Sequence, residues 1–149
     1  MQVFTIAPAG MKPWWVFLAA GVLLASIFAM LAVSMLGSRT ARFEVDAGGL
    51  RIRGDFYGRR IPAAVIRADE ARRVDLASEP ELRPKLRTWG TGLPGYQAGW
   101  FRLASGEKAL LYVTDRRKMV YVPTTAGYGL LLSPDDPDGF VSALKGMAR

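Results

Sequence analysis

The sequence predicts one N-terminal membrane-spanning helix followed by a mainly-β barrel or sandwich of about seven antiparallel strands, closed by a C-terminal amphipathic helix. Three observations predict this fold class. Residues 14–36 are apolar and contain no charged side chain. Short apolar segments separated by turn residues then follow one another almost to the end of the chain. After residue 136 the apolar side chains change to helical spacing.

The apolar run reads WWVFLAAGVLLASIFAMLAVSML. As an α-helix it would extend about 34 Å, enough to cross a hydrocarbon core of ~30 Å. Its polar side chains are Ser26 and Ser34, whose hydroxyls can bond to carbonyls one turn earlier. Trp14 and Trp15 suit the headgroup level of a bilayer. We therefore expect a transmembrane helix over residues 14–36.

A cleaved signal peptide is the alternative interpretation of this run. The run is longer than the roughly 7–15 apolar residues of a signal peptide, and Lys12 is the one base before it. Arg39 and Arg42 follow the run, so the positive-inside rule places the folded domain in the cytoplasm. We expect a single-pass protein of the cell (inner or plasma) membrane, with the lipid bilayer as its first partner.

The chain divides into four parts. We expect a short N-terminal segment over residues 1–13, the transmembrane helix over 14–36, a juxtamembrane linker over 37–42 and one folded domain over 43–149. The net charge is +7, with 20 bases and 13 acids. After residue 43 the two signs are interspersed, which is typical of an ordinary protein surface rather than of a nucleic-acid interface. We expect no nucleic-acid partner.

Cysteine and histidine are both absent. Ordinary zinc, iron–sulfur and haem ligation, and nucleophiles activated by histidine, are therefore excluded. We expect no catalytic residue, no metal site and no cofactor. A membrane enzyme that uses Asp69, Glu70 or Asp75 is a distant alternative, because no paired-carboxylate or metal-binding spacing supports it.

Small residues recur along one face of the expected transmembrane helix. Gly21, Ala25 and Ala29 stand at positions i, i+4 and i+8, a pattern that permits close helix approach. We consider this stripe a possible helix-association face, for a homo-oligomer or for assembly with another membrane protein. The alternative is that glycine and alanine are simply common in membrane helices.

The strands follow the helix. Residues 50–53 (LRIR) alternate with period two, and Ser105-Gly106 marks a hairpin turn. Residues 79–84, with two prolines, suit a surface loop with one helical turn. Strands are expected at residues 43–45, 50–53, 56–61 (ended by Pro62), 73–76, 100–103, 109–113, 119–122 and 130–132.

The C-terminal segment has the signals of a helix. Residues 133–138 (SPDDPD) supply capping side chains, a proline near the helix start and acids for the first turn. Phe140, Val141 and Leu144 then form an apolar stripe. We expect one amphipathic helix that closes the domain.

Three segments carry a resemblance to a known family: GLRIRGDFYGRRIPAAVI, GTGLPGYQAGWF and LLSPDDPDGFVSALK. Together they resemble the bacterial pleckstrin-homology-like (PH-like) domains that follow membrane helices, over roughly residues 43–145. The resemblance implies a PH-like barrel held at a membrane and no assigned catalysis. Lipid-binding PH domains carry clustered bases in their first hairpin turn, whereas the turn here, residues 45–49 (VDAGG), is acidic and rich in glycine. Inositol phosphate recognition is therefore not predicted.

The segment from Gly90 to Gly95 matches the pattern G-x-G-x-x-G of dinucleotide-binding proteins. That fingerprint requires a helix immediately afterwards. Here glycines and aromatic residues follow, so we expect the motif to form a tight structural loop in which aromatic side chains pack over bare glycine backbone. Gly92, Pro94, Gly95 and Trp100 would shape this loop. The aromatic side chains of this segment are expected in the core rather than in a ligand groove: Trp89, Tyr96, Trp100 and Phe101.

Two basic clusters are candidates for contact with anionic headgroups or an acidic partner: Arg59 and Arg60, and Arg116, Arg117 and Lys118. The alternative is that they are solvated turn charges.

The function predicted from the sequence is that of a protein-interaction or scaffold module at the membrane, with another membrane-associated protein as partner. Two alternatives remain open. The protein can be an accessory subunit of a membrane complex assembled through its helix, or a binder of anionic lipid surfaces.

Overall fold

The computed structural model describes residues 14–54, 57–93 and 95–147. These residues divide into two compact units between Leu36 and Gly37. The expected N-terminal segment, with Lys12, lies outside the described residues, as does Pro94.

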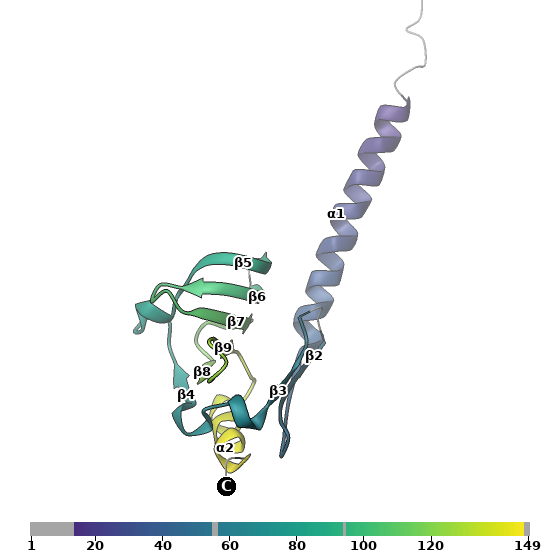
Figure 1. Cartoon of the computed structure of the whole chain (residues 1–149). Coiled ribbons are helices and arrows are strands. Elements are labelled where there is room, and N and C mark those ends of the chain that lie inside the picture. The colour runs from purple at the N-terminus through teal and green to yellow at the C-terminus, as the bar shows by residue number, and fades with distance from the viewer. Residues whose placement is uncertain (1–13, 55–56, 94, 148–149) are drawn as a thin grey trace, which may run out of the picture. The chain divides into compact units, whose positions relative to one another are not determined.

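Helix α1 spans Trp14–Thr40 (Figure 1). Its part from Trp14 to Val33 has a mean hydropathy of 2.6 and is not buried in the protein, and among the described residues it is the one helix long and apolar enough to cross a membrane. The Ser26 hydroxyl donates to the Val22 carbonyl at 2.8 Å, the back-bond expected from the sequence. The helix continues through residues 37–40 of the expected linker, so Ala41 alone separates it from the first strand.

A three-stranded antiparallel sheet begins the folded domain (Figure 1). It consists of β1 (Arg42–Asp46), β2 (Gly49–Arg53) and β3 (Arg60–Pro62), in the order β1-β2-β3. The alternation predicted for β2 is present, because Leu50 and Ile52 are buried while Arg53 is exposed. Strand β1 lies at one edge of this sheet.

A second sheet has six strands in the order β4-β8-β9-β7-β6-β5. Their bounds are β4 (Arg72–Val74), β5 (Pro84–Leu93), β6 (Tyr96–Leu103), β7 (Lys108–Val113), β8 (Met119–Pro123) and β9 (Gly129–Leu132). The pairing is antiparallel as predicted, except that β9 runs parallel to β7. Strand β9 is buried on both faces, which suits a central strand. It lies between β7 and β8, antiparallel to β8 and parallel to β7.

The glycine-rich segment is not the loop that we expected. Strands β5 and β6 form a hairpin with eight residue pairs between Pro84 and Leu103, and Gly90 pairs with Gly99. The pattern G-x-G-x-x-G therefore belongs to a strand and its turn, with a second strand where the dinucleotide fingerprint needs a helix. Glycine content indicated a loop, but here two glycines let two strand backbones approach closely.

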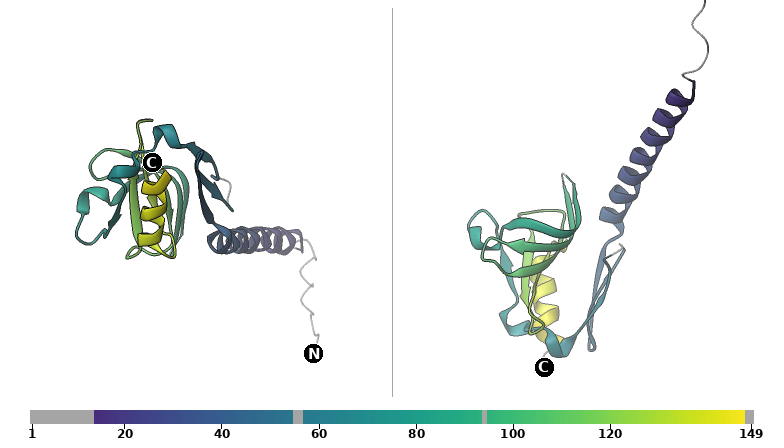
Figure 2. Two further views of the ribbon diagram at one scale, coloured as in Figure 1. Left: turned by 90° about the horizontal axis from the view of Figure 1, so that it is seen from below. Right: turned by 45° about the horizontal axis from the view of Figure 1, so that its top comes forward.

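The six-stranded sheet has a hydrophobic cluster on each face. The larger cluster joins the sheet to β2, β3 and helix α2 (Pro137–Met147), which lies against the sheet in Figure 2. Phe140 and Leu144 are buried and Val141 packs against the cluster, as the apolar stripe predicted. The second cluster lies between the other face, β4 and the 3-10 turn Pro80–Leu82, which is the helical turn expected in residues 79–84.

Candidate binding cleft

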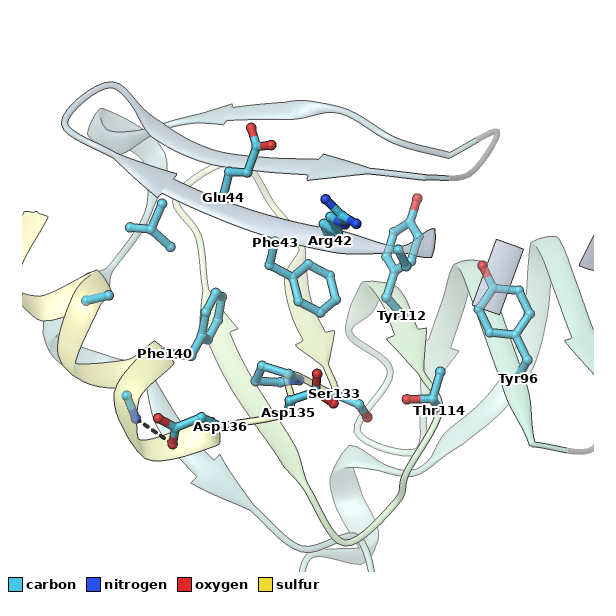
Figure 3. Close-up of a pocket in the computed structure, with 15 residues that line it drawn as sticks. Arg42, Phe43, Glu44, Tyr96, Tyr112, Thr114, Ser133, Asp135, Asp136 and Phe140 are labelled. Carbon is cyan, nitrogen blue, oxygen red and sulfur yellow. Dashed lines mark hydrogen bonds between the residues drawn. The ribbon is translucent and has the colours of Figure 1, made fainter. Parts of the chain in front are cut away.

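A cleft of about 910 Å³ lies between β1 and the first turns of α2 (Figure 3). Residues of β1 line one side, and Asp136, Phe140 and Ala143 line the other. The ends of β6 and β7 add Tyr96 and Tyr112. Segments from both ends of the domain therefore form the cleft.

Aromatic rings form the inner part of the cleft. The ring of Phe43 lies 5.9 Å from that of Phe140 and meets that of Tyr112 edge to face at 6.3 Å, as centroid distances. In Figure 3 the rings of Phe43 and Phe140 point toward each other beneath β1. Such a surface accommodates an apolar side chain.

Carboxylates predominate at the rim. Asp135 and Asp136 are exposed there, with Arg42 as the one base among the lining residues. Glu44 also lines the cleft, but its side chain points away from it in Figure 3 and its carboxylate pairs with Arg53 at 3.2 Å. Asp136 also caps α2, because its Oδ1 accepts from the Gly139 amide at 3.0 Å and its carbonyl accepts from the Phe140 amide at 3.0 Å. The rim is therefore locally acidic in a protein whose net charge is +7.

The edge of β1 that faces away from β2 pairs with no other described strand. The Ile52 amide donates to the Arg59 carbonyl at 2.9 Å, so the backbone groups of Ile52 face β3. Phe43 is the β1 partner of Ile52 and is therefore in a non-hydrogen-bonded pair with it. It follows that the backbone N–H and C=O groups of Phe43 and Val45 point toward the unpaired edge.

The basic residues chosen from the sequence lie outside this cleft. Arg59 lies over the ring of Trp100, with Cζ 4.8 Å from the ring centroid, and Arg60 pairs with Asp46 at 3.4 Å. Arg116 and Arg117 line a second cleft of about 450 Å³, and Lys118 is exposed in the turn before β8. Sequence reasoning missed the cleft, although the sequence contained two signals for it. The first expected strand, β1, has no strand before it with which to pair. Its aromatic residue, Phe43, packs against the same core as the apolar stripe of α2.

The four aromatic residues of the β5–β6 hairpin differ in burial. Tyr96 and Phe101 are in the core, as expected, and Trp100 packs against it. Trp89 is 72% exposed, contrary to the expectation of a core position. It lies on β5, an edge strand whose outer side pairs with no other described strand.

Two of the three carboxylates considered for catalysis, Glu70 and Asp75, have local structural partners. Glu70 pairs with Arg67 at 3.0 Å, and the Asp75 carboxylate accepts from the Ala77 amide at 2.8 Å. Within residues 14–54, 57–93 and 95–147, no three acidic side chains gather into a group that could hold a metal ion. Gly21, Ala25 and Ala29 are exposed along α1.

Two pKa values are raised, both outside the cleft. Burial, together with hydrogen bonds from its hydroxyl to Glu107 at 2.9 Å, raises the pKa of Tyr121 to about 12. The hydrogen bond to Glu79, with nitrogen and oxygen 2.6 Å apart, raises the pKa of Arg72. Both groups hold the β4 and β8 side of the domain together and keep their charge states at neutral pH.

Comparison with known proteins identifies the domain. A model of the bacterial PH domain family matches residues 41–148, which is most of the chain. No curated protein and no solved structure gives a match. The family match covers both sheets and α2, and it confirms the resemblance seen in the sequence. The chain therefore belongs to the bacterial PH domain family.

Proposed function

We propose that this protein is a single-pass membrane protein whose PH domain binds an extended, basic segment of another membrane protein along β1. The observation that carries the proposal is the unpaired edge of β1 beside an aromatic cleft. The role is binding rather than catalysis, as is general for PH domains.

An unpaired strand edge binds an extended chain through its backbone. Phe43 and Val45 supply two N–H donors and two C=O acceptors at the unpaired edge. These groups fix the direction of a bound strand but not its sequence. Side-chain contacts in the cleft must therefore supply the specificity.

The cleft favours a particular pattern of side chains. A bound strand presents alternate side chains to opposite faces, because its period is two residues. The set on the cleft side then meets the rings of Phe43 and Phe140 and the carboxylates of Asp135 and Asp136. A segment that places apolar residues and Lys or Arg at alternate positions, all on this side, fits the arrangement.

The chain also indicates where the partner is found. Ala41, the first lining residue of the cleft, follows α1 directly in the sequence. If α1 crosses the membrane with the domain in the cytoplasm, a juxtamembrane segment of a second membrane protein is confined to the same surface. Such confinement raises its effective concentration over that of a soluble protein. Basic residues are abundant in cytoplasmic juxtamembrane segments.

Photo-crosslinking in native membranes tests this proposal. A photoreactive amino acid at Ala143, which lines the cleft, is compared with the same amino acid at Ser142, an exposed neighbour on α2 that does not line it. We expect a discrete protein adduct from position 143 that is absent from position 142. Asp135→Lys should reduce the adduct, whereas Asp69→Lys, which makes the same charge change outside the cleft, should not.

Hydrogen exchange distinguishes strand addition from other modes of binding. In the free full-length protein the amides of Phe43 and Val45 should exchange quickly, and that of Glu44 slowly because it faces β2. Addition of the crosslinked partner's segment should slow exchange at Phe43 and Val45 specifically. Equal adducts from positions 142 and 143, or unchanged exchange at Phe43 and Val45, would contradict the proposal.

A further inference from the structure

A second surface of the domain combines exposed apolar side chains with unpaired bases. We define this basic–aromatic face by Leu86, Trp89, Trp100, Arg102, Lys108 and Arg59. We propose that it contacts the anionic phospholipid headgroups of the membrane that anchors the chain. The proposal rests on the membrane insertion of α1 proposed above, but not on peptide binding in the cleft.

The centre of the face is Trp100. The guanidinium carbon of Arg59 lies 4.8 Å from its ring centroid and the ammonium nitrogen of Lys108 lies 4.5 Å from it. Tyr128 meets the same indole edge to face at 5.0 Å. The ring therefore holds two cations near one another at the surface, where their charges remain available to an anion.

Leu86 and Trp89 form the apolar edge of the face. They are 59% and 72% exposed, and outside α1 they are the exposed large hydrophobic residues of the described chain. Trp89 pairs with Trp100 and Leu86 pairs with Arg102 across the β5–β6 ladder. Because directly opposed residues share a face of the sheet, these four side chains lie on one side.

The bases of this face have no carboxylate partner among the described residues. Elsewhere in the domain several bases form ion pairs, as Arg60 does with Asp46 and Arg72 does with Glu79. No such ion pair involves Arg59, Arg102 or Lys108 within the described residues. Among the described residues the face is therefore positively charged.

This chemistry fits an anionic bilayer surface. An indole and an aliphatic side chain insert at the headgroup level, while neighbouring bases attract anionic headgroups. An acidic protein segment offers the same charges, but the tether keeps the bilayer at a permanently high effective concentration. We therefore choose phospholipid over protein as the occupant.

The chain contains no cysteine, which permits a site-specific test. The full-length Leu86→Cys protein carries a fluorophore at residue 86 and is reconstituted into phosphatidylcholine vesicles with or without phosphatidylglycerol. A lipid-borne quencher reports contact with the bilayer. We expect phosphatidylglycerol to increase quenching at residue 86, and not at residue 142 in the matched Ser142→Cys protein on α2.

Two variants of equal charge separate this face from general attraction. Arg59→Gln with Lys108→Gln should abolish the increase in quenching caused by phosphatidylglycerol. Arg116→Gln with Arg117→Gln removes the same charge from the second cleft and should preserve it. In the protein that keeps Arg59 and Lys108, added salt should reverse the increase in quenching, because salt screens exposed charges.

Three results would overturn the proposal. The first is equal quenching at residue 86 in the two lipid mixtures. The second is an equal loss of quenching in the two charge variants. The third is shielding of residue 86 in native membranes but not in protein-free anionic vesicles, a result that would indicate an acidic protein as the occupant. Co-flotation of the full-length protein with vesicles at high salt reports insertion of α1 separately. A failure of α1 to insert is thereby distinguished from a failure of the basic–aromatic face to contact the lipid.

Discussion

The backbones of Gly90 and Gly99 lie against each other across the β5–β6 ladder. A Cβ built on Gly99 would lie 2.5 Å from the Gly90 Cα and 2.5 Å from the Trp89 carbonyl oxygen, and Gly99 has φ +118°. No side chain fits this contact, and the left-handed backbone region favours glycine. The hairpin that carries Trp89 and Trp100 therefore depends on two residues without side chains.

Gly99→Ala should destabilise the domain more than a positive φ alone would. The matched control is Gly106→Ala, at φ +91° with no atom within 4 Å of the added Cβ. The control should lower the free energy of unfolding by about 1–2 kcal/mol. Gly99→Ala should lower the free energy of unfolding by about 1–3 kcal/mol more, because the backbone must move to admit the methyl group. Urea denaturation of the full-length protein in detergent, followed by tryptophan fluorescence, measures both, and equal losses would disprove the steric account.

Asp136→Ala should remove the cap of α2 and loosen one wall of the cleft. The Gly139 amide then loses its acceptor, and we expect the free energy of unfolding to fall by about 1 kcal/mol. Asp135→Ala removes the same charge from the neighbouring exposed position and should change stability little. The comparison is made by urea denaturation. If the two variants lost the same stability, charge rather than capping would be responsible.

Tyr121 should make stability fall at high pH. Its pKa is about 12 in the folded protein against 10.0 for the free side chain, so the folded state binds the proton more tightly. The resulting stabilisation is complete below pH 10 and is lost as the pH rises toward 12. Tyr121→Phe, which cannot ionise, should lack this component, as measured by urea midpoints over the alkaline range. The difference between the absorbance titrations of the two proteins should give the pKa of Tyr121 directly.

The stripe of small residues on α1 predicts helix association. Gly21, Ala25 and Ala29 are exposed, and nothing lies within 4 Å of a Cβ placed on Gly21. If the stripe is an interface, Ala25→Leu should reduce a detergent-stable oligomer, because the larger side chain keeps the helices apart. Ala20→Leu adds the same volume at a position about 140° around the helix from Ala25 and should preserve the oligomer. An oligomer that withstands Ala25→Leu would show that the stripe is not the interface.

The features predicted correctly from the sequence depend on residues that are close together in the chain. The apolar run defined α1, the alternation of Leu50 and Ile52 defined β2, and the spacing of Phe140 and Leu144 defined the buried face of α2. The glycine-rich segment misled this reasoning. Glycine usually marks a loop, and only the pairing of Gly90 with Gly99 shows that it permits close contact between two strands.

The sequence by itself determined the helix, the mainly-β domain behind it and its family. The tertiary structure alone decided what each surface offers. The cleft requires β1 and α2, which are far apart in the chain, and its free edge depends on β1 having no neighbour beyond β2. Likewise, Tyr96 is buried and Trp89 exposed because β6 is an inner strand and β5 an edge strand. Side-chain periodicity indicates that a strand has two faces, but only the packing of the other elements determines which face and which edge remain uncovered.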